Sequence, residues 1–170
     1  RRHAAGGAVG AAGCKALPLV GDVRDDELVT AAVAETAEAF GGIDIVVNNA
    51  SAIDLSKTED ISMKKYDLMN DINARGSFLL AKSSIRWLKK SGNAHILTLS
   101  TPISLDPQWF TTPPPNTMAQ FGMSLVTLAL SVELPALAVA GHSLLPATAL
   151  HTSALSHVVV AARLVHAHRP

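Results

Sequence analysis

The sequence has a single cysteine and few aromatic residues, and each scarcity excludes a class of protein. Cys14 cannot form a disulfide within the chain or build a cysteine metal cluster, and a lone cysteine is most often a small core residue. The aromatic residues make up 4% of the chain and do not alternate with basic residues, as a surface that stacks nucleic-acid bases requires. The formal net charge is +0, so we expect no nucleic-acid partner.

Long apolar runs are also missing from the sequence. No run reaches the roughly 20 residues that a membrane-spanning helix requires. The first residues, RRHAAGG, lack the apolar region of a signal peptide. With 48% hydrophobic and 16% charged residues, the composition is typical of a globular domain. We therefore expect a cytoplasmic protein with no membrane partner.

What the sequence does contain is a regular alternation of strand and helix patterns. Short, continuously apolar segments predict strands at 16–23, 43–51 and 94–100, and amphipathic segments predict helices at 24–42, 62–90 and 116–134. Buried strands that alternate with helices favour a parallel sheet covered on both faces. The sequence therefore predicts an α/β fold with a doubly wound, Rossmann-type parallel sheet.

Ligands of such sheets bind at the carboxyl ends of the strands. In this sequence those ends are small and polar: Asp22-Val23, Asn48 to Ser51, and Ser100-Thr101. The Asp22-Val23 pair suits either an adenine contact or a turn before a helix. The amides of Asn48 and its neighbour suit either a tight turn or a ligand, because asparagine is poor strand material.

Two further patterns have weaker interpretations. The glycine-rich start, GGAVGAAG, resembles a phosphate loop, but such a loop follows a hydrophobic strand, and here it follows RRHAA, so we interpret it as the end of a helix near Gly13. Residues 135–170 contain no Asp or Glu and five of the seven histidines, without the spacing of a metal site, so we predict no metal. A nucleophilic hydrolase finds no support, because no G-x-S-x-G motif is present.

Four motifs carry a resemblance to a known family: DIVVNNA at 44–50, NARG at 73–76, HILTLS at 95–100 and PATALHT at 146–152. With them the chain resembles the short-chain dehydrogenase/reductase family, and most of all its hydroxysteroid dehydrogenase-like branch. The resemblance divides the chain into a truncated Rossmann-type dehydrogenase domain at 1–134 and a divergent C-terminal segment at 135–170, which matches loosely to about 153. The family's first strand and glycine-rich loop correspond to positions before residue 1. It thus implies an incomplete domain without the first βα unit, with an edge or face of the sheet uncovered.

The resemblance also implies NAD or NADP as cofactor and hydride transfer to or from a small carbonyl or alcohol substrate. Carried over by position, Asp22 and Val23 lie near the adenine, Asn48, Ala50 and Ser51 along the cofactor ribose, and Thr148 and Thr152 at the nicotinamide amide. Asn73 corresponds to an asparagine that kinks a helix and holds a water of the proton relay. Ser100 and Thr101 flank the place of the catalytic serine.

The catalytic tyrosine and lysine of the family correspond here to Asn116 and Gln120. The chemistry requires a hydroxyl whose pKa can approach neutrality, and an asparagine amide does not titrate in that range. Glutamine keeps a hydrogen bond but carries no charge to lower a neighbour's pKa. Two hypotheses follow, an oxidoreductase with a degenerate active site or an inactive scaffold that binds a partner. The family also implies a homo-oligomer through the helices at 62–90 and 116–134.

Overall fold

The computed structural model describes residues 13, 15–134, 140–144 and 159–162. Its elements in chain order are helix α2 (Asp26–Phe40), strand β1 (Ile43–Asn48), helix α3 (Met63–Asn70), the π-helical turn η1 (Asp71–Arg75), helix α4 (Gly76–Leu88), strand β2 (His95–Leu99), the 3-10 turn η2 (Pro107–Phe110), helix α5 (Pro114–Glu133), and strands β3 (Ala140–Leu144) and β4 (Val159–Ala162). The predicted strands at 43–51 and 94–100 and the three predicted helices are confirmed, each with boundaries shifted by a few residues.

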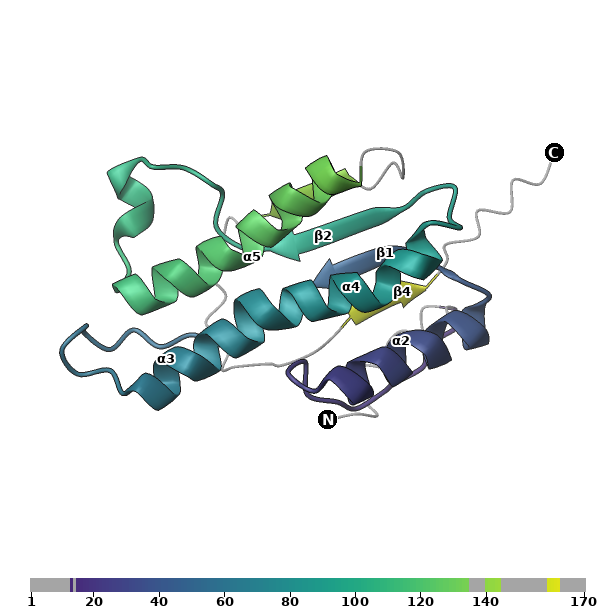
Figure 1. The fold of residues 1–170 in the computed structure, drawn as a ribbon, viewed down its shortest axis with the longest axis horizontal. Helices are drawn as coiled ribbons and strands as arrows, with labels where there is room; N and C mark the ends of the chain where they lie inside the picture. Colours follow the sequence, from purple (N-terminus) through teal and green to yellow (C-terminus); the bar gives the residue numbers. More distant parts are fainter. Residues whose placement is uncertain (1–12, 14, 135–139, 145–158, 163–170) are drawn as a thin grey trace.

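The strands form one sheet in the order β3-β2-β1-β4 (Figure 1). β1 pairs in parallel with β2, and β2 pairs in parallel with β3, as the crossover connections through helices require. β4 pairs antiparallel with β1, in a register that places Val47 opposite Val159 and shifts between Ile43 and Ile45. The predicted parallel α/β sheet is confirmed, and the edge of β1 away from β2 is covered by β4 rather than left open.

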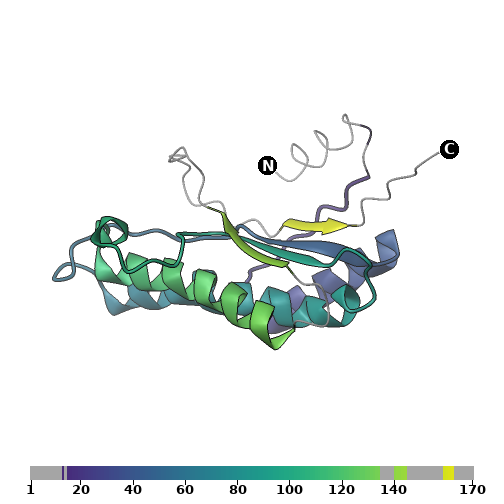
Figure 2. The ribbon, with the colours of Figure 1, turned by 90° about the horizontal axis from the view of Figure 1, so that it is seen from above.

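The described helices all lie on one face of this sheet (Figure 2). The core sits between them and the strands, where Val33 of α2, Val46 of β1 and Ile96 of β2 are at most 1% exposed. Leu80 of α4 joins the same cluster of buried side chains. Full burial of such a side chain stabilises the fold by about 1.5–3 kcal/mol. The core therefore fixes the ends of β1 and β2 against α4 and α5.

The ends of α2 follow from its sequence. The Oδ1 of Asp25 accepts hydrogen bonds from the backbone N–H groups of Glu27 and Leu28, both at 3.0 Å, which caps the first turn. Gly41 ends the helix in the left-handed conformation, with φ of 78°, where a side chain would be strained. These caps place residues 22–25 beside α4, where the polar contacts of the next section form.

The predicted strand at 16–23 is wrong. Residues 15–22 adopt no regular structure, and Leu19 and Val20 are 36% and 56% exposed. A strand requires a hydrogen-bonding neighbour, and the described strands pair with one another and not with this segment. The segment has the apolar residues of a buried strand, but no described strand lies beside it to form the hydrogen bonds of a sheet.

Candidate functional site

The carboxyl ends of β1 and β2 lie side by side, because the strands are parallel and Asn48 pairs with Thr98 in register. The polar residues that follow the two strands, Ser51 and Ser100, therefore come together. The first half of α5 packs against the same end and brings in Asn116 and Gln120. The structure thus gathers the polar residues that the sequence placed at three separate positions.

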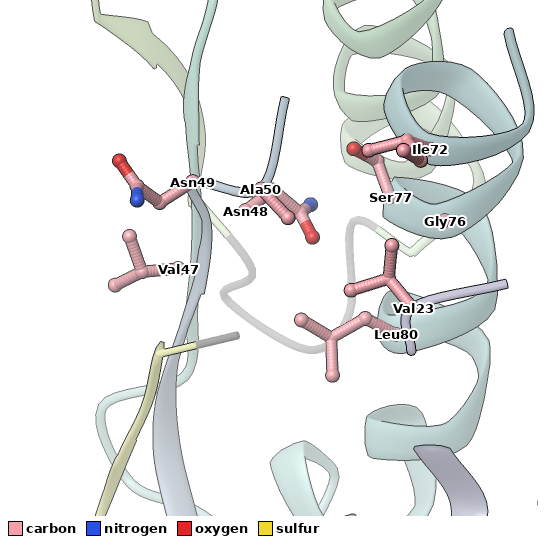
Figure 3. A pocket seen from close by; sticks show the side chains of 9 residues that line it. All are labelled: Val23, Val47, Asn48, Asn49, Ala50, Ile72, Gly76, Ser77 and Leu80. Carbon is pink, nitrogen blue, oxygen red and sulfur yellow. The ribbon is translucent and has the colours of Figure 1, made fainter. Parts of the chain in front are cut away.

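A small pocket with a cavity volume of about 10 Å³, room for about one water molecule, lies between the end of β1 and the helices (Figure 3). The residues that line it are Val23, Val47, Asn48, Asn49, Ala50, Ile72, Gly76, Ser77 and Leu80. Most of these side chains are apolar and none is ionisable. Three of the predicted cofactor residues, Val23, Asn48 and Ala50, thus line the same pocket.

Five of the lining residues escaped the sequence analysis as site residues: Val47, Ile72, Gly76, Ser77 and Leu80. Gly76 could have been identified from the sequence, because it is the last residue of the NARG motif. A β-carbon added to Gly76 would lie 3.0 Å from the Cγ2 of Val23, so Gly76 packs directly against Val23 and leaves no space for a larger residue without a shift. The other four look like ordinary apolar or small helix and strand positions, and only the fold brings them together.

Asn73 lies in the π-helical turn between α3 and α4 and is fully buried. Its Oδ1 accepts a hydrogen bond from the backbone N–H of Ala52 at 2.7 Å, and its Nδ2 donates to the Ala52 carbonyl at 3.1 Å. This reciprocal pair ties the turn to the loop after β1. The helix irregularity expected at Asn73 is therefore present, and π-helical turns of this kind are frequent at functional sites.

Gln120 links the ends of the two strands. Its Nε2 donates to the Oγ of Ser51 at 3.0 Å, and its Oε1 accepts from the Oγ of Ser100 at 3.1 Å. The same Ser100 hydroxyl lies closer, at 2.6 Å, to the backbone carbonyl of Gln120, so its single proton is shared between the two Gln120 oxygens. Both ends of the Gln120 amide are therefore committed to protein partners, and this side chain forms a neutral bridge across the site.

Asn116 and Thr101 each hold a buried polar atom for which the structure gives no hydrogen-bond partner, the Asn116 Oδ1 and the Thr101 Oγ1. Asn116 is 6% exposed, and its Nδ2 donates to the Oγ1 of Thr112 at 3.3 Å. An unpaired buried polar atom costs about 1–3 kcal/mol, so such atoms mark positions where a bound group can be favourable.

A chain of buried polar groups runs beneath the pocket. The Nδ2 of Asn48 donates to the Oγ1 of Thr98 at 3.2 Å, and that hydroxyl lies 2.6 Å from the Oγ1 of Thr127 on α5. Thr127 in turn donates to the backbone carbonyl of Met123 at 3.1 Å. These contacts hold the Asn48 amide in a fixed orientation, pointing from β1 toward the helices (Figure 3).

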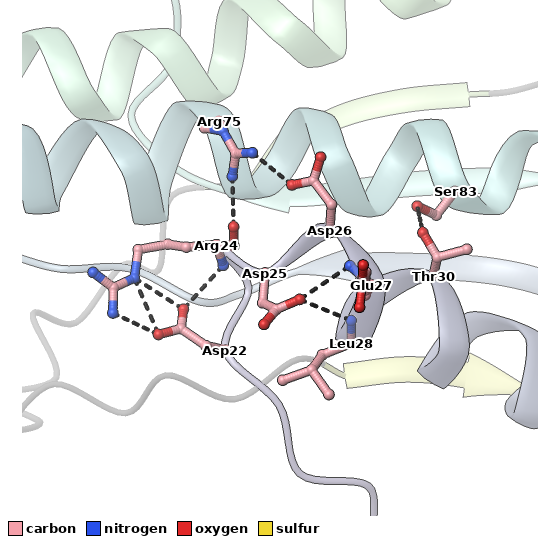
Figure 4. A network of polar contacts seen from close by, with 9 residues as sticks. All are labelled: Asp22, Arg24, Asp25, Asp26, Glu27, Leu28, Thr30, Arg75 and Ser83. Carbon is pink, nitrogen blue, oxygen red and sulfur yellow. Dashed lines mark hydrogen bonds and ion pairs between the residues drawn. The ribbon is translucent and has the colours of Figure 1, made fainter.

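Asp22 does not line the pocket, because Arg24 folds back on it (Figure 4). The Nη2 of Arg24 lies 2.5 Å from the Asp22 Oδ2, and hydrogen bonds from the Arg24 side chain, then from its backbone, lower the pKa of the Asp22 carboxyl. Arg75 donates to the Arg24 carbonyl at 2.7 Å and pairs with Asp26 at 2.5 Å. The Asp22 carboxylate is thus already balanced by a cation at the surface.

Two of the predicted cofactor residues, Thr148 and Thr152, lie outside the described residues, as do four of the five histidines of the tail. Among the residues that the structure does describe, no three potential metal ligands gather closely enough to hold a metal ion. Within the same part of the chain, none of the helices combines the length and hydropathy needed to cross a membrane.

The chain is similar to known proteins along most of its length. A family model described as enoyl-(acyl carrier protein) reductase matches residues 3–136. Hydroxysteroid dehydrogenase-like protein 2 of Xenopus laevis is 50% identical over 153 residues, which are 90% of this chain and 36% of that protein. The chain thus spans about a third of that relative's length.

Two solved structures share the fold at high identity. A putative dehydrogenase from Xanthomonas campestris is 50% identical with a TM-score of 0.80, and the match covers 85% of this chain and 54% of that one. A short-chain dehydrogenase from Mycobacterium thermoresistibile is 48% identical with a TM-score of 0.81, covering 85% of this chain and 51% of that one. The described fold therefore corresponds to about half of each of these structures.

Proposed function

The chain belongs to the short-chain dehydrogenase/reductase family, in its hydroxysteroid dehydrogenase-like branch, and from this membership we propose that it keeps the cofactor site of a carbonyl or alcohol oxidoreductase without the full proton-transfer machinery. The cofactor would be NAD or NADP, which carries the hydride when it is bound. The substrate would be a small carbonyl compound or alcohol, and the protein would act in the cytoplasm.

One observation carries this proposal: the pocket that joins Val23 to the strand-end residues Asn48 and Ala50. These residues are far apart in the sequence, and the resemblance assigns them to one cofactor. An apolar pocket with a few polar groups at a strand end is the usual form of a small-molecule site in an α/β sheet. The neutral, largely apolar lining and its place at the strand end support a cofactor of the expected class.

The opposite end of the site would be weak in proton transfer. Asn116 cannot give or take a proton near neutral pH, and the neutral Gln120 supplies no charge that would lower the pKa of a nearby hydroxyl. Among the hydroxyls at this end are those of Ser100, which donates to Gln120, and Thr101, whose Oγ1 has no hydrogen-bond partner in the structure. General acid–base catalysis contributes about 10²–10⁴-fold, and turnover in this chain would be lower by that factor.

Cofactor binding tests the proposal directly. Titration of the chain with NADH and with NADPH, followed by nucleotide fluorescence, should give saturable binding in the micromolar range. An absence of binding at millimolar concentrations of both would overturn the proposal. This measurement needs no knowledge of the substrate and no turnover.

A restoration experiment tests the interpretation of positions 116 and 120. The double variant Asn116→Tyr with Gln120→Lys should reduce a panel of small aldehydes and ketones faster than the matched variant Asn116→Phe with Gln120→Lys, which has the ring without the hydroxyl. The expected difference is about 10²–10⁴-fold. Equal rates in the two variants would contradict the assignment of Asn116 to the acid position.

A second candidate function is an inactive scaffold that binds a partner, and the outer face of α5 favours it. Met118, Leu125, Leu128 and Val132 are 54%, 52%, 51% and 72% exposed and follow one another at helical spacing. An apolar helix face without charged residues is typical of a surface that another protein covers. We propose a second copy of the chain as that partner, which is compatible with either function.

A further inference from the structure

The orientation of the Asn48 amide follows from the hydroxyl groups beneath it. The single proton of the Thr127 hydroxyl goes to the backbone carbonyl of Met123, at 3.1 Å. The Thr98 hydroxyl therefore donates across its 2.6 Å contact with Thr127, and toward Asn48 it can only accept. The Nδ2 of Asn48 thus faces Thr98, at 3.2 Å, and its Oδ1 is turned the other way. Because Asn48 is 4% exposed, this oxygen requires a donor inside the protein.

Ser77, in the first turn of α4, lines the same pocket and is also 4% exposed. A buried helical serine can donate to the carbonyl four residues earlier, as Ser84 does at 2.8 Å. For Ser77 that carbonyl belongs to Asn73, in the π-helical turn, and it already accepts from the Gly76 N–H. Within the described part of the chain, neither the Ser77 hydroxyl nor the Asn48 Oδ1 forms a hydrogen bond.

The space between these two polar groups has the size of one water molecule. Its volume of about 10 Å³ is close to the smallest that holds a water and is far below the volume of a small-molecule site. Figure 3 shows the Asn48 amide and the Ser77 hydroxyl on facing sides of this space, one on β1 and the other on α4. A buried water requires two to four polar partners, and these two residues supply two.

We infer that the pocket binds one ordered water molecule, which donates to the Asn48 Oδ1 and is hydrogen-bonded to the Ser77 hydroxyl. A metal cation is disfavoured because none of the lining side chains is ionisable. An apolar ligand is disfavoured because it would leave both polar groups unpaired in a buried place. The water site goes beyond the proposed function, because neither contact of the water involves a cofactor.

The water completes a line of hydrogen bonds that crosses the molecule. Thr127 of α5 contacts Thr98 of β2, and Thr98 accepts from Asn48 of β1. The water extends this line from Asn48 to Ser77, and so joins the end of β1 to the first turn of α4. The bound water is therefore part of the structure that fixes the Asn48 amide, and its loss would leave one end of the line unpaired.

Oxygen-17 magnetic relaxation dispersion tests the site on the full 170-residue chain, because it counts the water molecules that stay bound for longer than the protein takes to tumble. Ser77→Thr adds a methyl group that displaces water from so small a cavity, so this variant should hold one long-lived water fewer than the unmodified chain. Ser83→Thr, the same change in the same helix but outside the pocket, is the matched control and should keep the count. Equal counts in the unmodified chain and in Ser77→Thr would overturn the inference.

A second variant decides the result if Ser77→Thr does not fold. Ser77→Ala keeps the cavity open and removes one of the two partners, so the residence time of the water should fall by about 2- to 10-fold, the worth of one hydrogen bond. The NMR signals of the Asn48 side-chain amide should shift in this variant and stay in place in Ser83→Thr. An unchanged residence time together with an unshifted Asn48 amide would overturn the inference.

Discussion

Gly122 of α5 lies against Ala74 of the π-helical turn so closely that a β-carbon on Gly122 would stand 2.7 Å from the Cβ of Ala74. Real β-carbons do not approach one another this closely, so the glycine is a condition of the packing between α5 and η1. The same contact sets the distance between Asn73, in the turn, and the first half of α5. The geometry of the candidate site therefore depends on the absence of a single methyl group.

Gly122→Ala should lower the free energy of unfolding by about 1–3 kcal/mol, because an extra methyl in a tight contact forces the helices apart. This loss would exceed the gain of up to about 1 kcal/mol that alanine brings to a helix interior. Adding Ala74→Gly should recover part of the loss. Urea denaturation measures both, and Gly92→Ala, at a position with open space, is the control. A stabilised Gly122→Ala variant would contradict the packing described.

Asn73→Ala should destabilise the chain by about 2 kcal/mol or more, because it leaves the N–H and carbonyl of Ala52 without their partner in a buried place. The exposed Asn93 provides the control, and Asn93→Ala should change stability by less than about 0.5 kcal/mol. Denaturant unfolding of the two variants measures both changes in stability. Equal stabilities of the two variants would contradict a stabilising role for the reciprocal hydrogen bonds of Asn73 with Ala52.

The ion pair of Asp54 with Lys65 should be visible in a pH titration. The Lys65 hydrogen bond, at 2.6 Å, and the Ser56 contacts lower the pKa of Asp54 from 3.8 to about 2. A lowered folded-state pKa stabilises the fold above the unfolded value, and this contribution is lost as pH falls from about 4 through about 2. NMR titration of the Asp54 carboxyl should give a midpoint near 2, and Lys65→Met should raise it toward 3.8. A midpoint already near 3.8 in the unmodified chain would contradict the pairing.

The apolar face of α5 should make the chain self-associate. Sedimentation velocity at 100 µM should detect a dimer, and Leu125→Glu should convert it to a monomer by burying a charge in the interface. Ala39→Glu, an exposed position on α2, introduces the same charge away from that face and should leave the dimer intact. A monomer at this concentration in the unmodified chain would remove the support for a second copy as partner.

The sequence alone predicts the helices and strands whose boundaries depend on neighbouring residues in the chain. The Asp25 cap and Gly41 define α2, and the apolar runs at 43–51 and 94–100 define β1 and β2 without knowledge of their neighbours. The segment at 16–23 has the same apolar signal but no described neighbour, and strand formation depends on pairing that no local pattern contains. The antiparallel β4 was not predicted, because its pairing with β1 is likewise a property of the fold.

The same division applies to the site. Asn48, Ala50 and Val23 line one pocket, as their shared assignment to a cofactor predicts, and their roles toward a ligand stay predictions. The partners of Gln120 were not predictable, because a glutamine at a lysine position has no preferred partner until Ser51 and Ser100 are brought together. Asp22 pairs with Arg24, two residues along the chain, which is a local contact that the family motif does not contain.

The antiparallel pairing of β4 with β1 has a consequence for the order of events during synthesis. β1 is synthesised before β4, which is the last of the described elements. Until β4 is made, the edge of β1 that it covers has no described partner, and an exposed strand edge is a template for association with other chains. The nascent chain is therefore more prone to aggregate until Val159–Ala162 pairs with β1.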